Sequence, residues 1–321
     1  MIDCHTHAFP APDHWATLLP GWPLGPVLES AERLATPLSQ HLTEVAPRVA
    51  LSFEGLAAFR RQTPGLFHQL TELLVSMGLG VPMLLTGTLD RLRASMAQHG
   101  IRRSVVIAAP PTASNEWLLD AVVGDPRLVP VAYLPEPRSG KPPTTASEWA
   151  EAWMPLAEGG AAGFKIHENM AGLPPSHAAW RGTFEAARAT SRFVIIHTGR
   201  FTVPGYRRLS GADPRGYEPL LQEYPEVRVC LAHMNRDEPE VVWDLMRRYD
   251  QLFSDTSWQP AEALVRALHQ VGADRLLLGS DWPLLHADLQ GDALSTLRRA
   301  VRDDARLERI TLTNAEQFLA G

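Results

Sequence analysis

Six side chains of this sequence combine the types that bind catalytic metal ions, and each stands at the end of a short apolar run. They are His5, His7, His167, His197, His233 and Asp281. Neutral imidazoles with one carboxylate, and one position left for water, are typical of a catalytic Zn²⁺ site. The His-x-His pair at the N-terminus places both rings on one face of a strand, within reach of one ion. Because a short motif alone is weak evidence, the prediction depends on the other four residues.

The apolar runs that carry these residues predict the fold. Eight runs are rich in Val, Ile and Leu and are flanked by Gly, Pro, Asp or Asn, as buried parallel strands usually are. The predicted strands are Ile2–His7, Ser104–Ala109, Leu128–Leu134, Ala162–His167, Phe193–His197, Val227–His233, Leu252–Ser257 and Leu276–Asp281. Helix candidates between them include Asn115–Val123, Trp180–Ala189, Pro239–Tyr249 and Ala261–His269. Strands that alternate with helices predict an α/β fold, here a (β/α)₈ TIM barrel that forms a single domain over residues 1–321.

A barrel also explains why the six residues belong together. It directs the C-terminal ends of all its strands toward one mouth, so residues far apart in the chain converge there. For each residue taken singly, a structural role remains the competing interpretation: a histidine can be hydrogen-bonded, and Asp281 can cap a turn. Structural residues have no reason to gather on that one face, so the joint placement favours a site.

One connection is too long for an ordinary barrel loop. Residues 8–100 separate the first two predicted strands and include Trp15, Trp22 and helical stretches at Glu54–Arg61 and Leu66–Met77. We expect a helical, cap-like insertion after strand one that lines the pocket, since loops at this end of the strands build the active site. Peripheral packing is the alternative. A second excursion, Arg138–Thr145, is predicted to be an exposed loop.

The bulk composition excludes several classes of protein. The chain has 321 residues, 45% of them hydrophobic, and a net charge of -6, which provides no basic surface for nucleic acid. No apolar run is long enough to span a bilayer, and the N-terminal residues lack the pattern of a secretory leader. The two cysteines, Cys4 and Cys230, fit a reducing compartment. We therefore expect a cytoplasmic protein with a small-molecule substrate and with neither a nucleic-acid nor a membrane partner.

The order and spacing of the motifs resemble the amidohydrolase superfamily. The resemblance is closest to the amidohydrolase-related family that includes aminocarboxymuconate semialdehyde decarboxylase. The segments that carry it are Ile2–His7, Ile195–Gly199, Leu231–Met234, Leu278–Pro283 and a closing helix at Asn314–Leu319. They run from the first strand to the end of the chain and spare chiefly the long insertion.

The resemblance implies a set of roles around one divalent metal, most often Zn²⁺. His5, His7, His197 and Asp281 would bind the metal, and Asp281 would also take part in proton transfer. His233 would act on the water that the metal activates. A Zn²⁺ ion lowers the pKa of bound water to about 7, which makes hydroxide available at neutral pH. Family members commonly pair, which leaves a homodimer open.

The end of strand four admits more than one interpretation. Lys165 and His167 share a strand face and could bind an anionic group of the substrate, with Arg200 as a further anchor. A lysine that pairs with an acidic neighbour and a solvated loop arginine are equally consistent with the sequence. Some members of the superfamily carboxylate a strand-four lysine to bridge two metals, but this requires a second ligand set.

Two reactions fit the predicted metal site. The first is hydrolysis of an amide, lactone or ester-like bond of a small molecule, such as one that bears a carboxylate, by a metal-activated water. The resemblance favours it, since Lys165-x-His167 is more similar to predicted hydrolases of the family than to its decarboxylases. The alternative is non-oxidative decarboxylation of an aromatic or enol carboxylic acid. A third class, a barrel that has lost catalysis, would lack at least one ligand, and none is missing here. Asp255 and Ser257 are interpreted as supporting or structural residues, and Cys4 as pointing away from the ligands.

Overall fold

The computed structural model describes residues 1–11, 87–110, 112–135, 142–199, 212–236, 238–284 and 288–320. Its strands form one sheet of eight parallel members in the order β1 to β8, which confirms the predicted barrel. The strands are β1 (Ile2–His7), β2 (Arg103–Ile107), β3 (Leu128–Tyr133), β4 (Gly163–Ile166), β5 (Phe193–His197), β6 (Val229–Ala232), β7 (Leu252–Asp255) and β8 (Leu276–Leu277).

The barrel closes between β1 and the chain around and beyond β8. Cys4 N donates to Leu278 O at 2.8 Å, Asp281 N donates to His5 O at 2.8 Å, and His7 N donates to Trp282 O at 2.6 Å. The backbone bonds of the closure therefore lie beside His5, His7 and Asp281. Any distortion of this seam would change the distances between the three side chains.

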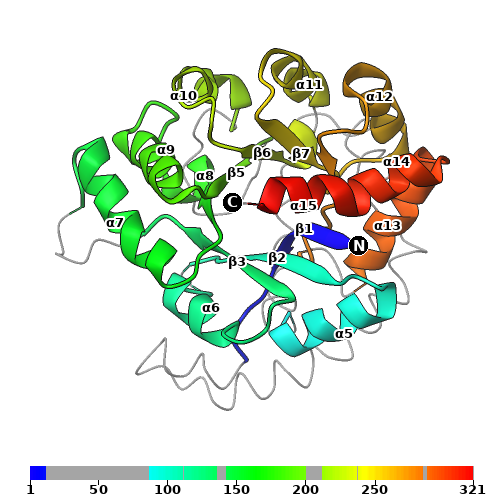
Figure 1. Ribbon diagram of the computed structural model, residues 1–321, viewed down its shortest axis with the longest axis horizontal. Coiled ribbons are helices and arrows are strands. Elements are labelled where there is room, and N and C mark those ends of the chain that lie inside the picture. The colour runs from blue at the N-terminus through cyan, green and yellow to red at the C-terminus, as the bar shows by residue number, and fades with distance from the viewer. Residues whose placement is uncertain are drawn as a thin grey trace, which may run out of the picture.

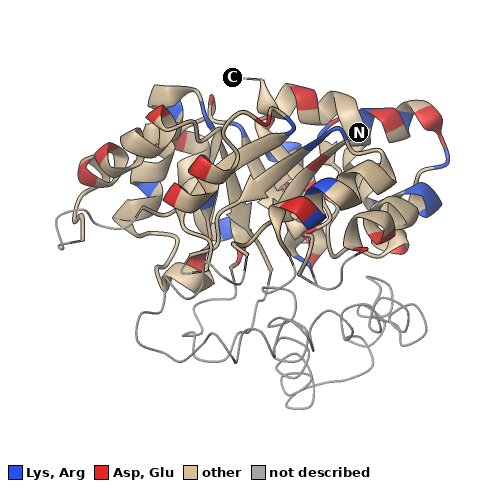
Figure 2. Cartoon of the chain, turned by 90° about the horizontal axis from the view of Figure 1, so that it is seen from below, with Lys and Arg blue, Asp and Glu red and all other residues tan. Residues whose placement is uncertain are grey.

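Helices surround the strands, and α15 lies across the end of the barrel at which β1 begins (Figure 1). The described α-helices are α5 (Leu89–His99), α6 (Asn115–Ala121), α7 (Ala146–Glu158), α8 (Glu168–Ala171), α9 (Ala178–Thr190), α10 (Glu218–Glu223), α11 (Pro239–Arg248), α12 (Ala261–Val271), α13 (Leu289–Ala300), α14 (Asp304–Glu308) and α15 (Asn314–Leu319). Acidic and basic side chains are interspersed over the outer helices (Figure 2). No helix among the described residues is long and apolar enough to cross a membrane.

Two apolar layers stabilise the barrel. The inner layer fills the barrel with residues that alternate along the strands, such as Val105, Ile195 and Phe253. Phe318 of α15 packs against this layer at the end of the barrel where β1 begins. The outer layer packs the opposite faces of the strands against the helices, with Phe164 on Trp153 as one contact. Since the interior is packed in this way, polar side chains that point inward are concentrated at the mouth, where the strands end.

The register of β1 changes inside the predicted His-x-His motif. Asp3 pairs with Ser104 and Thr6 with Val106, so two residues of β1 stand opposite one residue of β2. Such a β-bulge interrupts the alternation of side chains. Ile2 and Cys4 lie in the inner apolar layer by regular alternation, whereas Thr6, beyond the bulge, donates its hydroxyl to Val105 O at 2.7 Å. The bulge lets His5 and His7 both approach Asp281.

The predicted insertion falls almost entirely outside the described residues. Of residues 8–100, the structure describes 8–11 and 87–100, and the latter segment forms α5, which packs against α13 within the ring of helices. Thr88 caps this helix, and its side chain accepts a hydrogen bond from Arg91 N. The cap-like fold expected for the remaining residues stays a prediction. Half of the predicted loop Arg138–Thr145, residues 138–141, also lies outside the described residues.

Candidate metal centre

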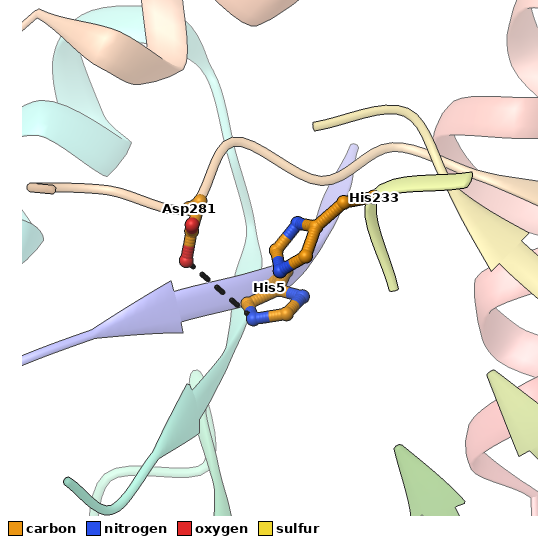
Figure 3. Close-up of side chains that lie close together, drawn as sticks. All are labelled: His5, His233 and Asp281. Carbon is orange, nitrogen blue, oxygen red and sulfur yellow. Dashed lines mark ion pairs between the residues drawn. The ribbon is translucent and has the colours of Figure 1, made fainter. Parts of the chain in front are cut away.

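Three side chains from separate parts of the chain converge at the mouth of the barrel. His5 comes from β1, His233 follows β6 directly, and Asp281 lies in the loop after β8; all three are buried. One potential ligand atom from each lies within 4.8 Å of the others, and the side chains point toward one another (Figure 3). These residues form a buried candidate metal site of two histidines and one aspartate. The group includes the predicted ligands His5 and Asp281, and it also includes His233, which the family resemblance assigns to the bound water.

Asp255, the last residue of β7, fixes the orientation of the His5 ring. His5 Nδ1 lies 2.8 Å from Asp255 Oδ2. Because a carboxylate accepts, Nδ1 carries the proton and the lone pair of a neutral ring is left on Nε2. That Nε2 lies 3.5 Å from Asp281 Oδ1. A carboxylate behind a ligand histidine is the usual arrangement in metal sites, because it sets the tautomer and raises ligand basicity.

His7, two residues further along β1, approaches the same carboxylate oxygen, and its ring lies 5.6 Å from that of His5 between centroids. Its Nδ1 lies 3.1 Å from Ile107 O, a carbonyl that can only accept, so Nε2 again holds the lone pair. His7 Nε2 lies 3.3 Å from Asp281 Oδ1. Among the described residues this buried oxygen receives no hydrogen bond. Two nitrogen lone pairs and a carboxylate oxygen thus face one another without a proton between them, which is the donor set that a divalent cation requires.

The carboxylate of Asp281 is held by unusual local geometry. Asp281 has a φ of 60°, in the left-handed region. Its Oδ2 accepts a hydrogen bond of 2.5 Å from the indole Nε1 of Trp258, which leaves Oδ1 for the histidines. Gly279 gives the loop its close approach to β7, since a Cβ there would lie 2.8 Å from Cβ of Asp255. The Gly-Ser-Asp order of the motif therefore has a steric basis.

His233 is oriented by a short chain of hydrogen bonds. Its Nδ1 lies 2.6 Å from Ser257 Oγ, and the Ser257 hydroxyl bonds to Asp255 Oδ1. Asp255 also accepts from His233 N at 3.2 Å. The ring lies 4.6 Å from that of His5, measured between centroids. One carboxylate therefore positions both His5 and His233, a more specific role for Asp255 and Ser257 than the sequence could give them.

The residues at the end of β4 lie inside the site. Lys165 is 2% exposed, and its Nζ lies at hydrogen-bond distance, 3.4 Å, from His5 Nε2, the nitrogen whose lone pair would bind a metal. His167 is stacked parallel on His197, with ring centroids 3.9 Å apart, and His197 in turn lies 4.9 Å from His233. The predicted ligand His197 thus adjoins the three convergent residues, and its place in the metal shell stays a prediction.

Burial keeps the rings of the site neutral. It lowers the pKa of His233 to about 3 and the pKa values of His5, His167 and His197 below the usual range. Neutral imidazole is the form that binds metals. Burial also lowers the pKa of Lys165 to about 8, which leaves it mainly protonated at neutral pH. Among the described residues one group of three or more metal-binding side chains converges, so a second ligand set for a bridging lysine is not found there.

Arg200, the predicted anion anchor, lies outside the described residues, but another arginine lies at the mouth. The guanidinium carbon of Arg236 stands 4.9 Å from the ring centroid of Trp258, the residue that donates to Asp281. Sequence reasoning missed both Arg236 and Trp258. The available signal was position alone: Arg236 follows His233 by three residues, and Trp258 follows Ser257 directly.

A parallel barrel with buried histidines and an aspartate at its mouth defines a class of metal-dependent barrel enzymes. The chain belongs to the amidohydrolase family, whose model matches residues 2–320. It is 26% identical over 120 residues to gamma-resorcylate decarboxylase from Rhizobium sp. (strain MTP-10005). That stretch spans 31% of this chain and 36% of the relative.

Solved structures of low sequence identity share the fold. One is 5-carboxyvanillate decarboxylase from Sphingomonas paucimobilis, with a TM-score of 0.59 and 14% identity over 99% of this chain and 98% of that one. Another is a dihydroxybenzoic acid decarboxylase from Polaromonas sp. JS666 with bound manganese and the inhibitor 2-nitroresorcinol (TM-score 0.58, 18% identity, 77% and 92% covered). A probable 2-pyrone-4,6-dicarboxylic acid hydrolase from Acinetobacter baumannii is also similar (TM-score 0.52, 18% identity, 73% and 89% covered).

Proposed function

We propose that this protein is a metal-dependent, non-oxidative decarboxylase of a small aromatic carboxylic acid. The observation that carries the proposal is the convergence of two ring nitrogens and Asp281 Oδ1 on one point, with the Lys165 ammonium beside it. The names of the curated relative and of two similar structures support this reaction over the hydrolysis that the sequence alone favours. The metal predicted as Zn²⁺ is proposed only as a divalent ion, since one of these relatives binds manganese.

The charges of the site favour an anionic substrate. Asp255 and Asp281 are both buried, and one divalent ion offsets their two negative charges. Lys165 then remains as a buried cation, with the Arg236 guanidinium above Trp258 close by. Burying the Lys165 ammonium is costly, so a substrate carboxylate that pairs with it stabilises the loaded site, and Arg236 is a second cation for the same carboxylate.

The residues of the chain provide what a decarboxylation requires. The carbon–carbon bond to the carboxylate breaks, carbon dioxide leaves, and the electron pair stays on the ring carbon, where it takes up a proton. When bound, the metal supplies a positive centre that holds substrate oxygens and withdraws electron density. Asp281, fixed by Trp258, and neutral His233, fixed by Ser257, are the groups placed to hold the proton.

Hydrolysis of a lactone or related ester-like bond is the second candidate. The same metal site could direct a water to a carbonyl carbon, and Lys165 could bind a carboxylate of the substrate. The similarity to the probable 2-pyrone-4,6-dicarboxylic acid hydrolase supports this possibility. The two reactions differ in their products, and this difference provides the test.

The deciding experiment is a substrate panel assayed for both products. The purified protein, loaded with Mn²⁺ or Zn²⁺, is incubated with 2,6-dihydroxybenzoate, 5-carboxyvanillate and 2-pyrone-4,6-dicarboxylate. Carbon dioxide is measured by a coupled bicarbonate assay, and acid release is measured in a pH-stat. Asp281→Asn serves as the control for contaminating activities. Carbon dioxide in equal amount to the substrate consumed is the expected result; acid release without carbon dioxide would assign the protein to the hydrolases.

A further inference from the structure

The turn that follows β6 has an unusual backbone. His233, Met234, Asn235 and Arg236 have φ values of 62°, 46°, 56° and 43°. Left-handed conformations are unfavourable for residues other than glycine, and four in succession persist only where neighbouring groups hold them. The turn has one internal bond, from Arg236 N to His233 O at 2.8 Å. The remaining support must come from other parts of the chain.

Gln259 provides this support from the loop after β7. Its side chain is fully buried, and its single amide nitrogen Nε2 donates to His233 O at 2.6 Å and to Arg236 O at 3.1 Å. One amide group thus bridges the first and last residues of the turn. On the other side, Thr198 Oγ1 accepts a hydrogen bond of 2.9 Å from Asn235 N. Both ends of the turn and its middle are therefore fixed.

The first and last residues of the turn, His233 and Arg236, carry the two groups whose spacing matters for the proposed reaction. His233 presents its ring to His5 and Ser257. Arg236 presents its guanidinium to the Trp258 ring, beside Asp281. We propose that Gln259 is a positioning residue that sets the spacing between the proton-handling His233 and the carboxylate-binding Arg236. The inference rests on the proposed function for the role of Arg236 and on the turn geometry for the role of Gln259.

The chain contains a matched control for this contact. Asn314 is also buried, and its amide nitrogen Nδ2 also bridges two main-chain carbonyls, Ala273 O at 2.6 Å and Leu276 O at 2.7 Å. It belongs to α15, at the opposite end of the barrel from the metal site (Figure 1). Gln259→Met and Asn314→Leu each remove a doubly used amide and nearly keep the side-chain shape, so their losses of stability should be similar.

Amide hydrogen exchange tests the turn without any substrate. In Gln259→Met we expect the amides of Asn235 and Arg236 to exchange about tenfold faster or more, because the buried bridge between the carbonyls of His233 and Arg236 is lost. In Asn314→Leu they should exchange as in the wild type. Unchanged exchange in Gln259→Met would overturn the proposal. Gln259→Glu, which keeps the shape but lacks the amide protons, is the second variant if Gln259→Met does not fold.

A binding comparison separates positioning from a general loss of structure. Mn²⁺-loaded protein is titrated with 2,6-dihydroxybenzoate and with resorcinol, which lacks the carboxylate. We expect Gln259→Met to weaken binding of the acid about tenfold and to leave resorcinol almost unaffected, while Asn314→Leu changes neither. Equal weakening of both compounds would refute the positioning role. If the wild type itself does not distinguish them, the decarboxylase proposal fails, and the exchange experiment alone decides whether Gln259 holds the turn.

Discussion

Replacing Asp255 by asparagine tests whether the site depends on the carboxylate behind His5. Asp255 accepts from His5 Nδ1 at 2.8 Å, from the backbone of His233 at 3.2 Å and of Ser257 at 3.0 Å, and from the Ser257 hydroxyl. Asparagine has a similar shape but only one accepting oxygen. Asparagine therefore cannot accept hydrogen bonds both from His5 Nδ1 and from the backbone N–H groups of His233 and Ser257.

The size of the effect follows from the two orientations open to the amide. If its NH₂ group faces His5, the ring proton moves to Nε2 and removes the lone pair that would bind the metal. If its oxygen faces His5, the NH₂ group meets the backbone N–H groups of His233 and Ser257, which then lack an acceptor. Either arrangement should weaken metal binding by about 10- to 100-fold, or roughly 1.4 to 2.7 kcal/mol.

Metal affinity of the purified, metal-free variant can be measured by Mn²⁺ titration with detection of the free ion by electron paramagnetic resonance. Asp3→Asn is the matched control, because Asp3 is another buried carboxylate, and its hydrogen bonds come from the His5 backbone N–H at 3.2 Å, from Ser280 and from Gln290 rather than from the His5 ring. The control should keep an affinity within about threefold of the wild type, since the ring tautomer is untouched. Wild-type affinity in Asp255→Asn would refute the assignment of His5 Nε2 as a ligand atom.

Three further predictions address neighbouring parts of the site. His5→Ala and Asp281→Asn should each abolish turnover while thermal melting shows a folded barrel, because the apolar interior lies below the mouth; full activity in either would contradict the site. Trp258→Phe should keep the metal, measured by elemental analysis, but lower kcat about tenfold, since the indole bond to Asp281 is lost. Gly279→Ala should destabilise the fold by about 1 to 3 kcal/mol in urea unfolding, because its Cβ would lie 2.8 Å from Asp255.

Most of the barrel could be predicted because its strands are buried on both faces. A strand such as Phe193–His197 is apolar at every position except its last, and its predicted and observed bounds agree. The last predicted strand, Leu276–Asp281, proved to be only Leu276–Leu277. Beyond Leu277 the chain still bonds to β1, as with Asp281 N to His5 O, but it curves into a loop. An apolar pattern indicates which residues are buried, and the residues after Leu277 are still buried although they no longer form a regular strand. The pattern therefore predicted a strand that was too long.

The candidate ligands could be predicted because strand ends and ligand chemistry coincide at a barrel mouth. The β-bulge at Cys4 and His5 could not, since an alternating pattern carries no sign of a register shift. The same holds for Trp258, which has a φ of 62°. Its indole reaches Asp281 only through that left-handed backbone, and nothing in its residue type or spacing signals the conformation.

The residues that motifs predict and the residues that only the backbone conformation places have different roles in the proposed reaction. His5 and Asp281 are specified by motifs, and the chemistry that they support is common to hydrolysis and decarboxylation. Two neighbouring groups, Arg236 and Trp258, are placed by the turn after β6 and by the loop after β7. Gln259 connects those two segments directly. We therefore expect variants of Arg236, Trp258 and Gln259 to change substrate specificity before they change metal binding, in contrast to variants of Asp255.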